Sequence, residues 1–105
     1  MDMTVEKITN GMRSIHPGEI LREEFLLPLE MSANALAMRL RVPAPRINDL
    51  VREKRGVSVD TALRLARFFN TTPEFWLNLQ TAYDLKITKA DITSEIEHDI
   101  TPLAA

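Results

Sequence analysis

Side chains able to recognise another molecule through hydrogen bonds are concentrated in residues 46–52 of this chain. Ile47, Leu50 and Val51 follow helical spacing, so they predict a short helix with one buried stripe. The other positions carry two arginines, an asparagine and an aspartate, which would then face outward. Arginine and asparagine can each form two parallel hydrogen bonds with a planar group such as the edge of a nucleic-acid base. The stretch therefore predicts recognition by hydrogen bonding rather than catalysis.

The sequence contains no arrangement that is typical of a catalytic or metal site. Cysteine is absent, which excludes disulfides, thiolate nucleophiles and thiolate metal ligands. No serine, histidine and aspartate form a supported triad, and the three glycines are scattered rather than gathered in a phosphate-binding loop. His16 is expected at the entry to a helix, and His98 stands among acids without metal-ligand spacing. We therefore expect no enzyme activity, no cofactor and no bound metal.

Two short helices separated by an abrupt turn are expected to position the recognition residues. Ser32 is a good N-cap for a helix over residues 33–40, whose small and apolar side chains repeat at helical spacing. Residues 41–43 interrupt the pattern, and a second helix is expected from about Pro43 to about Lys54. Two helices with so short a connection form a helix-turn-helix unit.

The rest of the chain predicts three more helices, so we expect an all-α fold of five helices. The first occupies residues 17–27 and should end before Pro28, because a proline disfavours the helical conformation of the residue that precedes it. The fourth follows the N-cap Ser58 and should end at Asn70. The fifth follows the cap Thr72 and has an apolar face that includes Tyr83, with Trp76 in the core.

These helices are expected to form one domain, residues 16–83. Residues 1–15 should be a flexible N-terminal segment, and residues 84–105 an acidic segment that is either a short dimerisation helix or a tail. Four apolar residues that the core is expected to leave over are candidates for a dimer interface: Leu77, Leu85, Ile87 and Ile92. No apolar run approaches the roughly 20 residues of a membrane span, and no signal-type core begins the chain, so we expect a cytoplasmic protein.

Charge is distributed unevenly along the chain, although its net value is only −2. Residues 39–67 hold eight basic and three acidic side chains, whereas residues 1–31 and 84–105 each hold three more acids than bases. A cationic centre between anionic ends favours one face for a polyanion and other faces for different partners. Beside a helix-turn-helix, the expected polyanion is double-stranded DNA, whose major groove admits one helix.

The leading end of the second helix should lie nearest the bases, because a recognition helix enters the groove with its N-terminal residues. The candidates for contacts with base edges are Ala44, Pro45, Arg46, Asn48 and Asp49. The candidates for contacts with phosphates are Arg39, Arg52, Lys54 and Arg55. Arg46 suits guanine and Asn48 suits adenine. Asp49 should reach a cytosine amine, orient Arg46 or Arg52, or point aside. The alternative is a helical protein-interaction module whose arginines are merely solvated.

About two-thirds of the chain, from His16 to about Leu85, resembles the HigA-type antitoxins of the Xre/Cro-like helix-turn-helix superfamily. The matching stretches are His16-Pro-Gly-Glu-Ile-Leu-Arg-Glu-Glu-Phe25, Lys54-Arg-Gly-Val-Ser58, Thr61-Ala-Leu-Arg-Leu-Ala66 and Thr72-Pro-Glu-Phe-Trp-Leu-Asn-Leu-Gln80. The resemblance implies a lambda-repressor-like fold and a homodimeric repressor of its own operon that binds a palindromic operator. It also implies a partner, a small basic RelE-like toxin of the HigB type, a ribonuclease that the antitoxin holds inactive.

Three points stay open within this resemblance. The chain departs from the family pattern at Arg41, where the inter-helix turn often has glycine. A stand-alone regulator without a toxin is the alternative in the same class. A cationic toxin could dock on an acidic surface that holds Glu19, Glu23, Glu24 and Glu30, or on the acidic C-terminus, although such residues can also form an ordinary solvated face.

Overall fold

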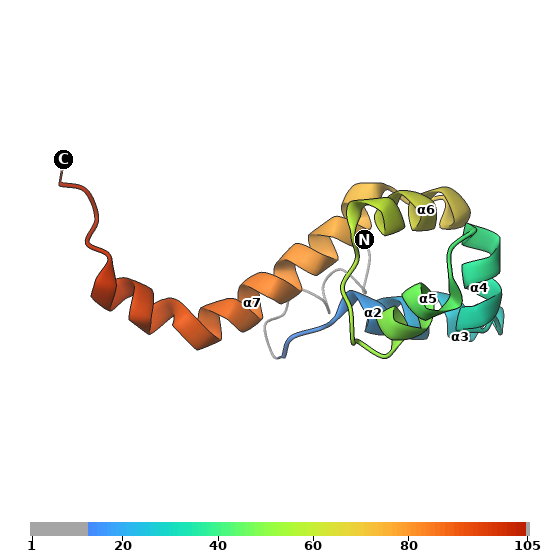
Figure 1. Cartoon of the computed structure of the whole chain (residues 1–105), viewed down its shortest axis with the longest axis horizontal. Helices are drawn as coiled ribbons and strands as arrows, with labels where there is room; N and C mark the ends of the chain where they lie inside the picture. The colour runs from blue at the N-terminus through green and yellow to red at the C-terminus, as the bar shows by residue number, and fades with distance from the viewer. Residues whose placement is uncertain (1–12, 105) are drawn as a thin grey trace.

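A computed structural model describes residues 13–104 of the 105-residue chain, so most of the expected flexible segment 1–15 lies outside the described residues. Within that range all regular structure is helical (Figure 1). The elements are α2 (Pro17–Ile20), η1 (Leu21–Leu26), α3 (Leu27–Leu29), α4 (Ala33–Leu40), α5 (Ala44–Val51), α6 (Val59–Phe69) and α7 (Pro73–Asp99). Because α2, η1 and α3 are consecutive, residues 13–104 form five helical stretches, and the expected all-α fold is confirmed.

The first helical stretch passes through Pro28, so its predicted end at Leu27 is wrong. η1 is a π-helical segment, in which a backbone N–H bonds to the carbonyl five residues earlier, as Leu27 does to Arg22. In an α-helix the ring of Pro28 would clash with the carbonyl four residues before it. The wider π turn moves that carbonyl aside, and the stretch continues to Leu29.

Four helices end in the same way, with a non-glycine residue in the left-handed conformation. These residues are Glu30, Arg41, Glu53 and Asn70, with φ angles of 52°, 62°, 64° and 58°. After each of them, the next backbone N–H bonds to a carbonyl five residues earlier, which is the hydrogen bond of a Schellman motif. The predicted role of Asn70 is confirmed. The same motif ends α5 at Val51, so the predicted end near Lys54 is wrong.

Three helices begin with the N-caps that the sequence predicts. The hydroxyl oxygens of Ser32, Ser58 and Thr72 each accept a hydrogen bond from the backbone N–H three residues later. α5 has no side-chain cap, and Pro43 occupies its N-cap position. The second proline, Pro45, lies in the first turn, where a missing N–H costs little because it has no helical partner.

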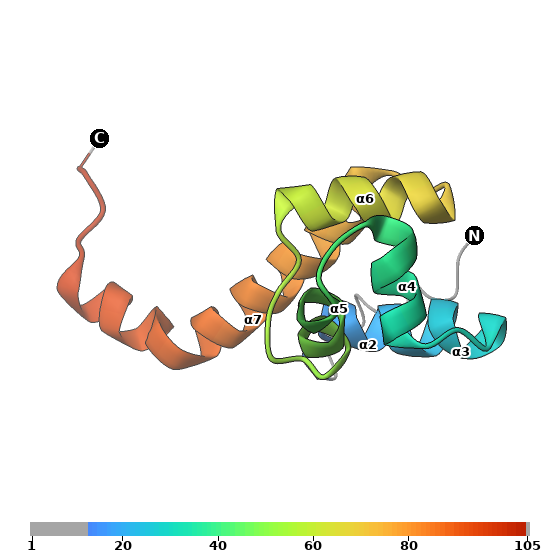
Figure 2. The ribbon, with the colours of Figure 1, turned by 45° about the vertical axis from the view of Figure 1, so that its right-hand side comes forward.

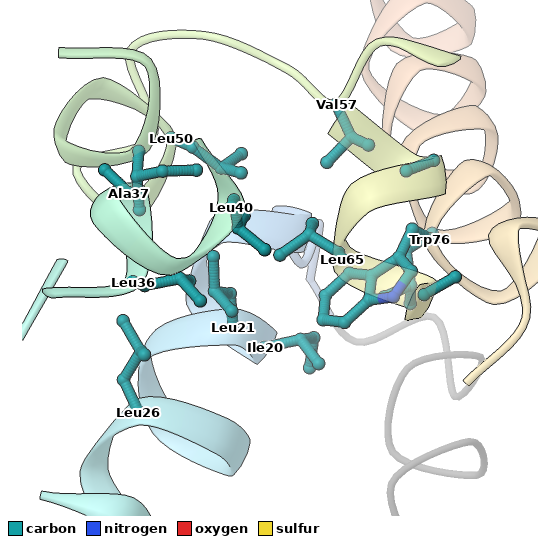
Figure 3. Close-up of a cluster of buried hydrophobic side chains, with 14 residues drawn as sticks. Ile20, Leu21, Leu26, Leu36, Ala37, Leu40, Leu50, Val57, Leu65 and Trp76 are labelled. Atoms are coloured by element: carbon teal, nitrogen blue, oxygen red, sulfur yellow. The ribbon is translucent and has the colours of Figure 1, made fainter. Parts of the chain in front are cut away.

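The hydrophobic core lies where the first helical stretch meets α4, α5, α6 and the beginning of α7 (Figure 3). Leu21, Leu36, Leu65 and Trp76 are fully buried in it. The indole N–H of Trp76 donates to Thr71 Oγ1 at 2.8 Å, so the largest core side chain leaves no polar atom unsatisfied. The prediction that Trp76 belongs to the core is confirmed.

α7 is one helix that packs on the body of the molecule with its first half and then projects away from it (Figures 1 and 2). The helix passes residue 84, where the sequence analysis expects a domain boundary, without a break. Its buried residues, Trp76 and Leu79, both lie in the first half. The radius of gyration of 16.2 Å therefore exceeds the roughly 13 Å of a compact chain of this length. Among residues 13–104, no helix combines the length and apolarity needed to cross a membrane.

Candidate nucleic-acid interface

α5 packs its apolar stripe against the core and turns its polar side outward. Ile47 and Leu50 are fully buried, whereas Pro45 is exposed and the polar residues that follow it are half-buried. Ala44 packs against the core, so it is the base-edge candidate least available to a ligand. α4 and α5 are in close contact across the turn at residues 41–43, which completes the helix-turn-helix that the sequence predicts.

Arg46 forms an ion pair that the sequence did not reveal. Its guanidinium bonds to the carboxylate of Asp60, in the first turn of α6. Arg64 donates to the same carboxylate at 3.0 Å and to the carbonyl of Leu40 at 2.8 Å, which connects α6 to the end of α4. The hydrogen bonds from Arg64 and Arg46 lower the pKa of Asp60. One carboxylate thus holds two guanidiniums, and Arg46 keeps unused N–H donors because a guanidinium has five.

Asn48 is held by a second asparagine on the preceding helix. Its Nδ2 donates to Asn34 Oδ1 at 2.7 Å and to the carbonyl of Ala44 at 3.0 Å. Asn34 lies at the start of α4 and is exposed, so both amides lie on the outer side of the helix-turn-helix. The sequence analysis missed Asn34, and its only signal there was a polar residue beside the N-cap Ser32.

The phosphate candidates differ in how far they are engaged. Arg55 pairs with Asp49 at 3.6 Å, an arrangement that none of the three expectations for Asp49 included. Arg39 lies over the ring of Phe68 at 5.2 Å, in a cation–π contact. Arg52 and Lys54 are exposed and, within the described part of the chain, have no ion-pair partner. These two side chains are therefore the most available to a polyanion.

The back of α5 is fixed by two residues of the first helical stretch. A Cβ atom on Gly18 would lie 1.8 Å from the carbonyl oxygen of Leu50, so only glycine allows this approach. Arg22 donates to the carbonyl of Val51 and pairs with Glu53 at 3.4 Å, which satisfies the C-terminal end of α5. These partners of Arg22 lie 29 and 31 residues further along the chain, so no local sequence signal indicates them.

His16 is a buried N-cap, as expected for a helix-entry residue. Its Nδ1 accepts a hydrogen bond from the backbone N–H of Gly18 at 2.8 Å, and its ring meets the ring of Tyr83 edge-on at 4.7 Å. Burial lowers the pKa of His16, so the neutral imidazole is favoured. Within residues 13–104, no three histidine or acidic side chains are grouped so that they could hold a metal ion.

The four candidate dimer residues differ in how far their side chains are exposed. Leu77 packs against the core, so the expectation that the core leaves it over is wrong. Leu85 is 56% exposed and Ile92 is 37% exposed. Both lie beyond Leu79, the last buried residue of α7, on the part of the helix that we call the projecting half. Ile87 is half-buried.

A helix-turn-helix whose second helix presents arginine and asparagine outward is typical of DNA-binding proteins, and this is the class that the fold and the site indicate. The profile of the helix-turn-helix family HTH_3 matches residues 21–76. Virulence-associated protein I of Dichelobacter nodosus is 55% identical over 89 residues, which are 85% of this chain and 82% of that protein. The chain belongs to this helix-turn-helix family and, within it, to the HigA-type antitoxins.

Two solved structures support that narrower assignment. The structure of Pseudomonas aeruginosa antitoxin HigA with the higBA promoter is 53% identical, with a TM-score of 0.85 over 88% of this chain and 100% of that one. The structure of antitoxin GraA in complex with its operator is 54% identical, with a TM-score of 0.84 over 92% of this chain and 98% of that one. In both structures, the similar protein is described together with DNA.

Proposed function

We propose that this protein is an antitoxin that represses its own operon by binding operator DNA and that also binds and inactivates a cognate toxin. The observation that carries the proposal is the outward polar face of α5, on a fold that matches antitoxins solved with their promoter and operator DNA. The protein acts by binding and not by catalysis. Its site of action is the cytoplasm, where the operator lies.

The geometry supports reading of DNA by the leading end of α5. With α5 in the major groove, Arg46 would donate to guanine, while Pro45 would touch an apolar base edge. Asn48 would accept a hydrogen bond from the amine of adenine through its Oδ1, because both of its N–H groups already donate to Asn34 and to the Ala44 carbonyl. Asn34 would hold the amide of Asn48 in a fixed orientation, because the two amides are 2.7 Å apart. Arg39, Arg52, Lys54 and Arg55 would contact phosphates and set the register without reading sequence.

A homodimer would place two copies of α5 on the two halves of a palindromic operator, about 34 Å apart. The projecting half of α7 favours dimerisation there, since Leu85 and Ile92 are exposed and lie close to one face at a spacing of seven residues. Ile87 would lie at the margin of that interface. Leu77, which already packs in the core, would contribute only indirectly.

The toxin would be a small basic ribonuclease of the RelE-like type, encoded beside the antitoxin gene. Two anionic regions, residues 1–31 and 84–105, offer charge complementary to such a protein. The antitoxin would occupy the toxin in a stable complex and would itself perform no chemistry.

The experiment that tests this proposal uses the full chain and the DNA upstream of its own gene. Fluorescence anisotropy should detect saturable binding that outcompetes random DNA of the same length by at least about 1,000-fold. The product of the adjacent small basic reading frame should co-purify with the chain. Binding of operator without such a partner would favour the stand-alone regulator, and absence of any DNA binding at low salt would refute the repressor role.

A further inference from the structure

Two leucines of α3 are exposed to solvent, and no contact within the described residues buries their side chains. Leu27 is 67% exposed and Leu29 is 55% exposed, although both belong to a short helical turn that ends at the left-handed residue Glu30. Beside them is a groove of about 340 Å³ whose apolar lining includes Leu26, Met31 and Val51. Apolar surface gathered around a groove is typical of a site that another molecule covers.

Acidic side chains surround this apolar area. Glu23 lines the groove, Glu24 is exposed and comes three residues before Leu27, and Glu30 follows α3 directly. Glu23 and Glu53 both pair with Arg22, which leaves that cluster of three with a net negative charge. Within residues 13–104, Glu24 and Glu30 have no ion pair. We call the leucines, the groove and these acids the α3 surface.

The charge of the α3 surface excludes DNA as its occupant, because carboxylates repel phosphates. Its position also separates it from the proposed dimer contact. α3 lies at one end of the molecule, and the projecting half of α7 lies at the other in both views (Figures 1 and 2). A dimer formed through α7 would therefore leave the α3 surface accessible on each copy.

We infer that the α3 surface is the docking site for the basic toxin, an inference that rests on the proposed function. A cationic protein matches the acidic rim, and an apolar side chain of that protein would enter the groove between Leu27 and Met31. This arrangement, an apolar centre within a charged rim, is the usual organisation of a protein–protein contact. It would let the antitoxin hold a toxin and DNA at the same time, because α5 presents its reading face through other residues.

The test compares two charge-matched double variants of the full chain. The surface variant carries Glu24→Lys and Leu27→Lys. The control carries Glu74→Lys at the start of α7, outside both anionic regions, and Leu63→Lys on α6, where the leucine is 53% exposed. The probe is the purified product of the adjacent small basic reading frame, titrated by calorimetry.

We expect the surface variant to bind it about 100-fold more weakly and the control to bind within threefold of wild type. Both variants should keep wild-type helicity and operator binding.

Other results would overturn either the docking site alone or the proposed function together with it. If wild type binds the probe and both variants bind equally well, the α3 surface is wrong and the proposed function stands. If wild type does not bind the probe, the toxin role fails and the docking site fails with it. A surface variant that changes the oligomeric state instead would assign the surface to a second copy of this chain. Amide hydrogen exchange of the wild-type complex gives a measurement without substitutions, and protection should be greatest in residues 23–33.

Discussion

At the scale of single residues, Arg46 connects the fold with the proposed recognition of DNA. In the free protein, Asp60 fixes the guanidinium at one edge, and the remaining donors can reach a base. We predict that Arg46→Ala reduces the preference for operator over random DNA by about 1–3 kcal/mol, because guanine loses its bidentate partner. Competition binding with operator and random duplexes measures this preference.

Arg55→Ala is the comparison, and it should weaken the binding of both duplexes alike and lower the salt dependence of binding. Equal losses on both duplexes for Arg46→Ala would show that Arg46 does not read sequence.

The imidazole of His16 predicts a dependence of stability on pH. Because burial lowers its pKa in the folded state, the unfolded chain takes up the proton first as the pH falls. The stability that the neutral imidazole of His16 gives the folded protein is therefore complete above the ordinary histidine pKa of about 6.5. It is lost progressively as the pH falls below that value. His16→Asn keeps an N-cap but does not titrate, so the loss of stability between pH 7 and pH 5 should be smaller in that variant. Urea unfolding of both proteins measures it, and identical pH profiles would rule out His16 as the cause.

Single residues were predictable from the sequence only where local spacing decides the outcome. The outward position of Asn48 follows from the buried stripe of its own helix. Its partner Asn34 and the partner of Arg46 each lie 14 residues away, in other helices. No periodicity within one helix encodes such contacts, because they depend on how the helices pack.

At the scale of the helices, the left-handed ends carry a measurable strain. Arg41 ends α4 with a φ of 62°, which is unfavourable for a residue with a Cβ atom. We predict that Arg41→Gly raises the free energy of unfolding by about 1 kcal/mol. Arg41→Ala removes the same charge but keeps the Cβ atom, so it should give no such gain. Chemical denaturation of the three proteins distinguishes them, and an equal gain in both variants would assign the effect to charge instead.

Helix packing behind α5 depends on one glycine. Gly18→Ala would place a Cβ atom 1.8 Å from the Leu50 carbonyl, a backbone atom that cannot move without displacing α5. We predict a loss of stability of about 2 kcal/mol or more, and weaker operator binding in the fraction that folds. Gly56→Ala is the matched control, because its Cβ atom would meet only the flexible side chain of Gln80. A Gly18→Ala protein as stable as the control would contradict this account.

Helix starts were more predictable than helix ends. Ser32, Ser58 and Thr72 announce their helices through a side chain that bonds its own local backbone. The π turn before Pro28 and the early end of α5 were not predictable, because charged residues stand where glycine usually signals a left-handed end. The continuity of α7 through residue 84 was missed because its apolar stripe stops facing the core there, while the helix itself persists.

At the scale of the whole molecule, the three functions proposed occupy separate places. The reading face of α5, the α3 surface and the projecting half of α7 use different residues of an elongated molecule with extents of 53 × 31 × 24 Å. The sequence predicted the uneven charge that separates a cationic centre from anionic ends. It did not predict the shape, because the packing of α7 determines how far the acidic end lies from the core.

The projecting half of α7 gives the prediction that tests this arrangement. Leu85 and Ile92 would lose their apolar contact if both became aspartate, because two copies would then bring four like charges together. We predict that the double variant is a folded monomer that binds one operator half-site as wild type does but binds the full palindrome about 100-fold more weakly, since the second site loses its tethered partner. Ala90→Asp with Ser94→Asp places the same charges on the opposite side of the helix and should leave the dimer intact. Analytical ultracentrifugation and anisotropy on half and full sites measure both effects. A double variant that still sediments as a dimer would place the two-fold contact elsewhere on the molecule.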